Sequence, residues 1–361
     1  MVEWKKLGEI MTIVRGASPR PIKNYITNNA DGVNWIKIGD VSPDAKFITS
    51  SSEKITKEGA EKSRLLHSGD FILSNSMSFG RPYILKIDGC IHDGWIAMSD
   101  YERYVSSGYL YEILNSNSVQ DYWKMKANNG GAMTNLNSDI VRDTIIPIPS
   151  LSEQTRIVGI LDTFTASIDN LKEQIAQRRK QYEFYRDELI SFLFAKSPIV
   201  TMKDVAIIKN GKDYKHLSEG EVPVYGTGGI MTYVDSSFSD KPTVLLPRKG
   251  SVENIYYVNE PFWTVDTIYW TEIDTNKIEP KYLYYSLLKY NLKDFAYGGA
   301  RPSLSQPILY RLEIPLPSLS EQSRIVFILD TFEASIQNLE AQLSQREKQY
   351  EYYRNKLLSF E

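Results

Sequence analysis

Cysteine and histidine, which often bind metals or take part in catalysis, are sparse in this chain of 361 residues. It has one cysteine, Cys90, and three histidines, His67, His92 and His216, which are not clustered. A single cysteine excludes an internal disulfide, and no Cys/His spacing fits a metal site, so we expect no bound metal. The sequence has no G-x-x-x-x-G-K-S/T phosphate loop and no Asn/Asp-Pro-Pro-Tyr/Phe motif for adenine methylation. These absences disfavour a catalytic protein.

Basic and small polar residues alternate in several loop segments, and their chemistry is the most suggestive in the chain. In the major groove of DNA, arginine pairs with guanine and asparagine with adenine through two hydrogen bonds each. Base contact is therefore one interpretation of these segments, and a solvated loop is the other. Glycines in "GGARPS" would let the backbone approach DNA closely beside Arg301, which makes this turn the best single candidate. The candidate residues are Arg15, Ser18, Arg20, Lys23, Asn75, Ser76, Ser78, Arg81, Lys212, Tyr214, Lys215, Arg248, Lys249, Arg301 and Ser303.

One long segment occurs twice and must form a major structural element. Residues 147–192 and 315–360 align at a constant offset of 168, with 32 identities in 46 positions. Similarity of this extent over a fixed offset indicates an internal repeat. We expect two long helices, over residues 150–196 and 318–361.

Each predicted helix has a recognisable start and an apolar seam. Ser150 and Ser318 stand three residues before Glu153 and Glu321, the S-x-x-E pattern of a capping box. Apolar residues then recur at alternating steps of four and three, which is typical of a coiled coil. The expected seam residues are Ile157, Leu161, Phe164, Ile168, Leu171 and Ile175 in the first helix, and Ile325, Leu329, Phe332, Ile336, Leu339 and Leu343 in the second. The same spacing continues through Tyr182, Tyr185, Leu189 and Phe192, and through Tyr350, Tyr353, Leu357 and Phe360.

The two seams are natural partners, and we expect them to pair antiparallel so that each preceding domain sits at the start of its own helix. Arg178 and Arg346 interrupt the seams at matching positions. Such polar residues can fix the register of a coiled coil. Alternatively, their stems pack in the seam while the charged ends reach solvent.

The segments before the helices, 1–149 and 197–317, read as two mixed α/β domains, which we call the first and second heads. Strand-like runs include "DFILSNS", "RPYILKI", "PTVLLP" and "NIYYV", while "GYLYEILNS" and "KYLYYSLLK" read as matching helices. Paired glycines at 228–229 and 298–299 read as tight turns. Beyond a few landmarks the heads differ. The expected fold is therefore α/β (α+β), with two different heads and two long antiparallel coiled-coil helices.

The chain resembles the specificity subunits of type I restriction-modification systems, over nearly its whole length. Helices of that family typically open with Pro-x-Leu-x-Glu-Gln-x-x-Ile, matched by "PSLSEQTRIV" and "PSLSEQSRIV". Its recognition domains often contain a Gly-x-x-Pro segment and then a "pWI-x-IGD"-like strand, matched at residues 16–19 and 35–40. The second head resembles another recurrent class through "PVYGTGGI" and "LLPRKGS". Val33-Asn34 stands where a proline often precedes the tryptophan, a local departure.

The resemblance implies a non-catalytic DNA specificity subunit whose two target recognition domains each read half of a bipartite, asymmetric site. It implies that the helix pair sets the gap between the half-sites and docks two methyltransferase subunits. S-adenosylmethionine would bind to those partners and no cofactor to this chain; restriction or translocase subunits are a further class of partner. Because the two helices are expected to be antiparallel, we also expect a quasi-circular, pseudo-two-fold arrangement with Met1 near Glu361.

The charge of the heads suggests that this chain does not hold DNA alone. Residues 1–150 contain 17 basic and 17 acidic residues and residues 197–317 contain 13 and 14, giving net charges of 0 and −1. A lone DNA-binding protein usually has a basic surface, so we expect partners to neutralise most of the phosphates. An autonomous coiled-coil DNA-binding regulator is the alternative, and it lacks a recognition-helix motif. An enzyme with an unrecognised site is a third class, without supporting residue spacing.

No part of the sequence suggests a membrane protein. No apolar run approaches the roughly 18 residues of a membrane helix. The start, "MVEWKKLGEI", lacks the apolar region of a secretory signal. We expect a cytoplasmic protein with no membrane partner.

Overall fold

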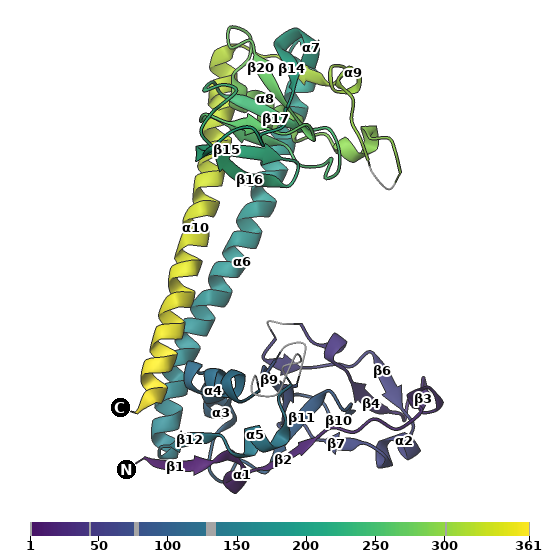
Figure 1. Ribbon diagram of the computed structural model, residues 1–361, viewed down its shortest axis with the longest axis vertical. Helices are drawn as coiled ribbons and strands as arrows, with labels where there is room; N and C mark the ends of the chain where they lie inside the picture. The colour runs from purple at the N-terminus through teal and green to yellow at the C-terminus, as the bar shows by residue number, and fades with distance from the viewer. Residues whose placement is uncertain (1, 43–44, 76–78, 128–134, 300–301, 361) are drawn as a thin grey trace. The chain divides into compact units, whose positions relative to one another are not determined.

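The chain forms two compact units, each of which combines one head with parts of both long helices (Figure 1). The first unit comprises Met1–Asn170 and Gln342–Glu361, and the second comprises Leu171–Ala341. The computed structural model describes residues 2–42, 45–75, 79–127, 135–299 and 302–360.

In the described residues, the first head is built on two five-stranded sheets and one two-stranded sheet. Their strand orders are β3-β6-β4-β10-β7, β2-β11-β8-β9-β5 and β1-β12. Strands β8 and β9 are buried at every position, which matches the nearly continuous apolar runs predicted as strands. The strands are β1 (Glu3–Lys6), β2 (Thr12–Arg15), β3 (Ile26–Thr27), β4 (Val33–Ile36), β5 (Phe47–Ile48), β6 (Glu53–Ile55), β7 (Arg64–Leu66), β8 (Phe71–Ser74), β9 (Pro82–Leu85), β10 (Gly89–Ile91), β11 (Trp95–Ser99) and β12 (Ile145–Ile148).

Short helices close the core of the first head. The core contains Phe71 of β8 and Tyr109 of α3, and it also contains Ile157 and Leu358 from the two long helices. The head and the helix pair therefore share one apolar core in this unit. The helices are α1 (Leu7–Ile10), η1 (Ile22–Asn24), η2 (Ile38–Asp40), α2 (Lys57–Glu61), α3 (Ser107–Leu114), α4 (Asn117–Ala127) and α5 (Ser138–Arg142).

The second head has smaller sheets, with the orders β14-β20-β17-β18, β16-β15-β19 and β13-β21. Gly229 connects β15 to β16 with a positive φ of 105°, so the paired glycines there form a tight turn as predicted. The strands are β13 (Ile199–Thr201), β14 (Ala206–Asn210), β15 (Glu219–Gly226), β16 (Gly229–Val234), β17 (Thr243–Pro247), β18 (Tyr256–Val258), β19 (Trp263–Thr264), β20 (Ile268–Ile273) and β21 (Glu313–Pro315). The helices are α7 (Met202–Val205), α8 (Pro280–Leu287), η4 (Leu292–Phe295) and α9 (Gln306–Leu309).

The two predicted long helices are α6 (Leu151–Lys196) and α10 (Leu319–Ser359). The Ser150 and Ser318 side chains accept hydrogen bonds from the amides of Glu153 and Glu321, at 3.3 and 3.4 Å, as expected of helix caps. The two glutamates differ from the predicted capping box, because each carboxylate accepts from the arginine three residues further on. An arginine at that spacing offers a charged pair of donors, which competes with the single backbone amide.

The helices run antiparallel within the second unit. The rings of Tyr185 on α6 and Phe332 on α10 stack with centroids 5.5 Å apart. The Arg179 guanidinium lies 2.6 Å from a carboxylate oxygen of Glu340. Because the residue number rises along α6 while that of its partner falls along α10, the predicted antiparallel direction is confirmed in this unit.

Arg178 and Arg346 lie over phenylalanine rings of the opposite helix. The Arg178 guanidinium is 5.8 Å from the ring centre of Phe332, and that of Arg346 is 5.7 Å from the ring centre of Phe164. Phe164 also stacks on Tyr353 at 5.4 Å, within the first unit. Each unit thus has one phenylalanine held by an arginine and a tyrosine of the partner helix, an arrangement that favours one register.

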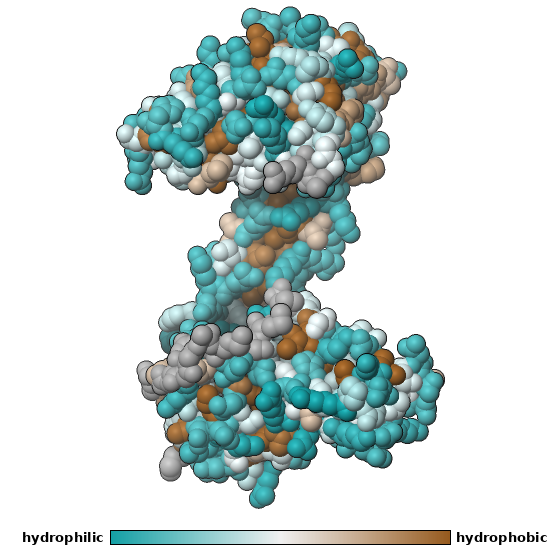
Figure 2. Space-filling view, turned by 45° about the vertical axis from the view of Figure 1, so that its right-hand side comes forward, coloured by the Kyte–Doolittle hydropathy of each residue, from teal (hydrophilic) through white to brown (hydrophobic). Residues whose placement is uncertain are grey.

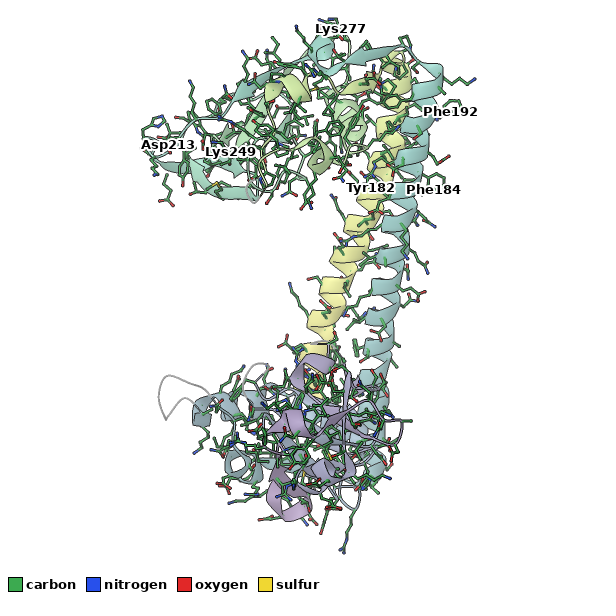
Figure 3. The ribbon with its side chains drawn as sticks, turned by 90° about the vertical axis from the view of Figure 1, so that its right-hand side faces the viewer. Tyr182, Phe184, Phe192, Asp213, Lys249 and Lys277 are labelled. Atoms are coloured by element: carbon green, nitrogen blue, oxygen red, sulfur yellow. The ribbon has the colours of Figure 1, made fainter. Side chains whose placement is uncertain are left out.

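Most predicted seam positions are buried or half-buried, but Tyr185 is 48% and Tyr353 is 41% exposed, and the seam changes near the end of α6. Phe192 is 61% exposed, so the prediction that the seam includes it is wrong. Figure 3 shows Phe192 on the side of α6 that faces away from the second head. Ile190 and Leu193 are buried instead, in the core of that head. The reason is that this part of α6 packs against the second head. The residues that face the head lie on a different side of α6 from those that would face a partner helix.

Elements from both ends of the chain meet in the first unit. Trp4 of β1 and Leu358 and Ser359 of α10 line one cavity of about 420 Å³. Met1 and Glu361, which were expected to be neighbours, lie outside the described residues.

Candidate DNA interface

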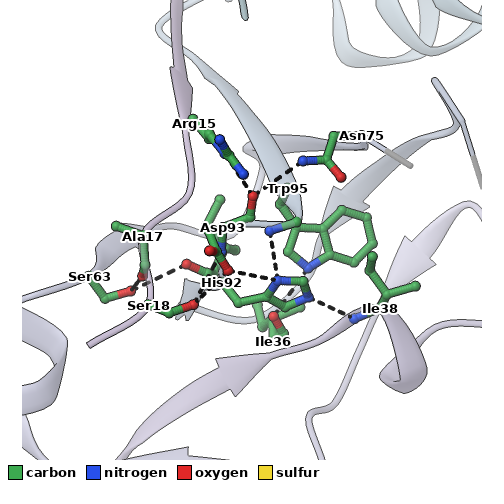
Figure 4. A network of polar contacts seen from close by, with 12 residues as sticks. Arg15, Ala17, Ser18, Ile36, Ile38, Ser63, Asn75, His92, Asp93 and Trp95 are labelled. Atoms are coloured by element: carbon green, nitrogen blue, oxygen red, sulfur yellow. Dashed lines mark hydrogen bonds and ion pairs between the residues drawn. The ribbon is translucent and has the colours of Figure 1, made fainter. Parts of the chain in front are cut away.

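Four of the predicted DNA-contacting residues of the first head surround one acidic residue, Asp93. Figure 4 shows three of them, Arg15, Ser18 and Asn75. The Ser18 hydroxyl donates to the Asp93 carboxylate at 2.9 Å, and the Arg20 guanidinium lies 3.3 Å from its other oxygen. Arg15 Nε and Asn75 Nδ2 both donate to the backbone carbonyl of Asp93, at 2.9 and 3.2 Å. We call these five residues the Asp93 cluster. It joins loops that are far apart in the sequence.

The Asp93 cluster rests on a buried base between β10 and β11. His92 Nδ1 accepts a hydrogen bond from the Gly94 amide at 2.8 Å, and burial lowers the pKa of His92. Trp95, 1% exposed, donates from its indole to the Ile36 carbonyl at 3.2 Å. The hydrogen bond from Ser18 is the largest effect that lowers the pKa of Asp93. Asp93 is therefore ionised at neutral pH and partly neutralises the cations around it.

These contacts separate the candidates of the first head into two groups. Arg15 and Asn75 each use a side-chain donor to hold the Asp93 carbonyl. These donors therefore stabilise the fold, and only the remaining ones could contact DNA. The side chain of Arg20 is 83% exposed and keeps donors free for a ligand. Lys23, in η1, is exposed as well.

Arg81 is the remaining candidate of the first head that the structure describes. Arg81 precedes β9, is half-buried, and has a buried Nη1 without a hydrogen-bond partner among the described residues. Arg81 therefore does not lie in a solvated loop. Ser76 and Ser78 lie outside the described residues.

In the second head, candidates from two loops flank the turn between β19 and β20. The Lys212 amide donates to the Thr264 carbonyl at 2.8 Å. Arg248 Nη1 donates to the Asp266 carbonyl at 3.0 Å, and Lys249 Nζ is 3.8 Å from the Asp266 carboxylate. As in the first head, an acidic residue lies between basic ones. Figure 3 shows the neighbouring Asp213 together with Lys249 at the end of the head farthest from the long helices.

Three further candidates of the second head differ in their surroundings. Tyr214 is half-buried and packs with the apolar cluster around Trp263, so its ring is partly structural. Lys215 is exposed. Ser303 exchanges backbone hydrogen bonds with Tyr297 at 2.8 and 3.0 Å and bridges to Lys249. Arg301 lies outside the described residues, while the preceding glycines at 298–299 have positive φ, as expected of a tight turn.

Sequence reasoning missed the acidic residues Asp93 and Asp266, because a carboxylate is not an expected neighbour of DNA phosphates. It also assigned no role to Gln154 and Gln322, the glutamines inside the repeated "SLSEQ" segment. Both are completely buried. In the sequence, the only sign of this was a glutamine at the same position in both copies of the repeated segment.

The two glutamines join each head to its long helix with the same hydrogen bonds. Gln154 accepts from the amide of Ser106, the N-cap of α3, at 2.8 Å and donates to the carbonyls of Tyr104 and Pro149, both at 3.0 Å. Gln322 makes the corresponding bonds in the second unit, accepting at 2.8 Å from the amide of the N-cap of α8. We call these side chains the glutamine clamps.

A second repeated contact lies beside each clamp. The Tyr109 hydroxyl donates to the Pro147 carbonyl at 2.9 Å, and the Tyr282 hydroxyl donates to the Pro315 carbonyl at 2.8 Å. Heads that differ in their loops are thus attached to the long helices in the same way.

No group of three or more His, Cys, Asp or Glu side chains in the described ranges could hold a metal ion. No helix there is long and apolar enough to cross a membrane.

Comparison with known proteins decides the family. The family model described as the type I restriction modification DNA specificity domain matches residues 1–178 and 196–347. The chain belongs to this family. The membership establishes a DNA-specificity role and gives no support to the alternative of an autonomous regulator.

Similar proteins cover almost the whole chain. A putative type I restriction enzyme specificity subunit of Haemophilus influenzae is 26% identical, over 99% of this chain and 96% of its own length. The crystal structure of the S subunit from M. genitalium matches with a TM-score of 0.57 at 17% identity, covering 100% of this chain and 97% of its own. A chain from a study of complex assembly in a type I system matches with a TM-score of 0.67 at 18% identity, covering 99% and 96%. These structures support the predicted fold of two heads and a helix pair.

Proposed function

We propose that this chain is a non-catalytic specificity subunit that reads a bipartite, asymmetric DNA site, with one half-site for each head. The observation behind this proposal is that two heads with different loops are joined to repeated helices by identical glutamine clamps. Identical attachment with different loops is what two independent readers require. The Asp93 cluster and the loops around Asp266 are the proposed contact surfaces.

We further propose that methyltransferase subunits, two per chain, bind along the long helices and bind S-adenosylmethionine themselves. Exposed aromatic residues support a protein-binding role for these helices, because Phe184 is 60% and Phe327 73% exposed. Figure 2 shows apolar side chains on the visible faces of the helix pair. Restriction or translocase subunits are proposed as further partners and the cytoplasm as the location.

The heads also support dependence on these partners. Asp93 and Asp266 lie among the basic residues of each proposed contact surface and reduce its positive field. Since phosphate neutralisation dominates DNA affinity, this chain should bind DNA weakly until methyltransferase subunits add their charge.

The decisive experiment compares the purified chain with the chain bound to its methyltransferase subunit. DNA binding and methyl transfer are measured on genomic DNA, and the methylated positions report both half-sites. We expect sequence-specific methylation only when both proteins are present. Methyl transfer by this chain alone, or specific methylation by the methyltransferase without it, would contradict the proposal. Replacing residues 1–146 with another head should then alter one half-site only.

A further inference from the structure

Each head rests on the long helices through a polar junction, and the two junctions correspond residue by residue. The glutamine clamps place the N-caps Ser106 and Glu279 at equivalent positions, an offset of 173. Tyr109 and Tyr282 keep the same offset and bond to equivalent prolines. Along the long helices the offset is 168. We call the two junctions the first and second seats.

The second seat combines two carboxylates of α10 with a lysine of the head. Lys281 Nζ lies 2.8 Å from Asp330 and 3.4 Å from Glu333. The buried Tyr285 hydroxyl donates to Asp330 at 2.5 Å, and the hydroxyl of Tyr182 on α6 donates to Glu333 at 3.2 Å. Arg186, on α6, is the second cation, with its guanidinium carbon 5.7 Å from the ring centre of Tyr182.

In the first seat, the carboxylate that binds the tyrosine comes from the head and not from a long helix. Glu112 of α3 is 2% exposed and accepts from the hydroxyl of Tyr350, the α10 counterpart of Tyr182, at 2.7 Å. Burial raises the pKa of Glu112, while Lys46 and Arg354 oppose this shift and Asp162 adds to it. The tyrosine of the long helix thus receives its carboxylate partner from the head in one seat and from the helix in the other.

The head residues that decide this difference lie one turn apart on equivalent helices. Gly108 and Glu112 of α3 correspond to Lys281 and Tyr285 of α8. The first head therefore brings a carboxylate, and the second brings an ammonium group and a neutral hydroxyl.

The long helices are adapted to this difference at one position. Thr165 of α6 corresponds to Glu333 of α10, whereas Asp162 and Asp330 are identical. A glutamate at position 165 would compete with Glu112 for the same tyrosine hydroxyl. Threonine there leaves room for the carboxylate of the head.

We propose that these residues form a matching code that assigns each head to its own seat, with Glu333 accepting the second head and excluding the first. The seats follow from packing alone, and only the meaning of the heads as recognition domains rests on the proposed function. The first seat contains Glu112 and Asp162 with Lys46 and Arg354. The second contains Asp330 and Glu333 with Lys281 and Arg186, and Arg186 also pairs with the more exposed Asp187 at 2.8 Å. The first head on the second seat would bring together Glu112, Asp330 and Glu333 against Lys46 and Arg186, leaving one carboxylate uncompensated.

The opposite exchange is milder. The second head on the first seat would place Lys281 near Asp162 and leave Tyr350 without its acceptor, but it would bury no excess negative charge. Burying an uncompensated charge destabilises a protein more than leaving one neutral hydroxyl without its acceptor does. The code therefore predicts that the second head tolerates the first seat better than the first head tolerates the second.

The first test uses full-length chimeras and their melting temperatures, which do not depend on DNA binding. In one chimera residues 2–149 also replace residues 197–317, so that the first head occupies both seats. We expect its melting temperature to fall by at least about 5 °C, and Glu333→Thr within the chimera to restore most of the loss. A chimera as stable as the parent, or one that Glu333→Thr leaves unchanged while it folds, would overturn the proposal.

The second test uses the native chain and decides the matter if the chimera does not fold. Thr165→Glu should lower the melting temperature, and Glu112→Gln in the same chain should remove most of that loss. Thr163→Glu, an exposed position on the same helix, is the matched control and should have little effect. If Thr165→Glu behaves like this control, the code does not exist, even if methylation shows that the chain is a specificity subunit.

Discussion

At the scale of residues, the proposed contact surfaces are organised by acidic side chains placed among basic ones. Asp93 holds Ser18 and Arg20 through its carboxylate and Arg15 through its carbonyl. An ionised carboxylate in this place reduces the positive electrostatic potential of the surface, but it fixes the positions of several hydrogen-bond donors. Fixed donors favour discrimination between bases, while mobile cations favour general phosphate binding.

Asp93→Ala should therefore reduce specificity more than affinity. We expect discrimination at one half-site to fall about tenfold, which corresponds to about 1.4 kcal/mol, because Ser18 and Arg20 lose their common acceptor. Binding to random DNA should be kept, since Arg20 is no longer neutralised. Competition binding by the methyltransferase complex measures both quantities.

Asp121→Ala is the control for this variant, because Asp121 is an exposed carboxylate of the same head that pairs only with Lys124, at 3.4 Å, in the described structure. It should change neither quantity. Unchanged discrimination in Asp93→Ala would show that the cluster is not part of the contact surface.

The buried Glu112 makes the stability of the first unit depend on pH. Burial raises its pKa in the folded chain, so the folded state binds its proton more strongly than the unfolded state. Its contribution to stability is therefore greatest at acidic pH and is lost as pH rises from the ordinary glutamate pKa through the raised value. Glu112→Gln should stabilise the chain more at pH 7 than at pH 5, as measured by thermal melts across this range. A constant difference would show that Glu112 does not titrate in this window.

At the scale of elements, the connection between head and helix depends on one amide side chain in each unit. Each glutamine clamp makes hydrogen bonds to the backbone at three places, including the N-cap of α3 or α8. The two glutamine side chains are completely buried, so removing one leaves these backbone groups without the amide that satisfies them. The clamp thus fixes where the head helix begins relative to the long helix.

Gln154→Ala should lower the free energy of unfolding by about 2–4 kcal/mol, because it leaves buried backbone groups without partners. Denaturant titration of the full chain measures this. Gln177→Ala is the control, since Gln177 is an exposed residue of α6 that bonds only to Glu173 in the described structure; it should cost little. If both substitutions lowered the free energy of unfolding by the same amount, the clamp would stabilise the chain no more than an exposed glutamine does.

At the scale of the whole molecule, the long helices are expected to act as a ruler between the half-sites. Their repeated sequence and their matched ring contacts, Phe164 with Tyr353 and Phe332 with Tyr185, define one antiparallel register. A segment removed from both helices between these contacts would preserve the register. It would also change the length by whole heptads, which keeps each face in almost the same direction.

Deleting residues 168–174 and 336–342 together should shorten the gap in the recognised site. Seven residues of helix correspond to about 10.5 Å, or about three base pairs at 3.4 Å each. Mapping the methylated sites of cells that express the shortened subunit measures the gap. Deleting only one of the two segments should destabilise the chain, because the seams then fall out of register. An unchanged gap after the double deletion would refute the ruler.

The sequence by itself determined the long helices, the buried strands and the family, because these depend on local periodicity, on apolar runs and on an internal repeat. "RPYILKI" and "KYLYYSLLK" form the predicted strand and helix. Only the tertiary structure decided that Phe192 leaves the seam, that Gln154 is buried and that Asp93 gathers the basic loop residues. Each of these outcomes depends on a segment remote in sequence that packs against the residue, and the residue's own neighbours along the chain contain no trace of that segment.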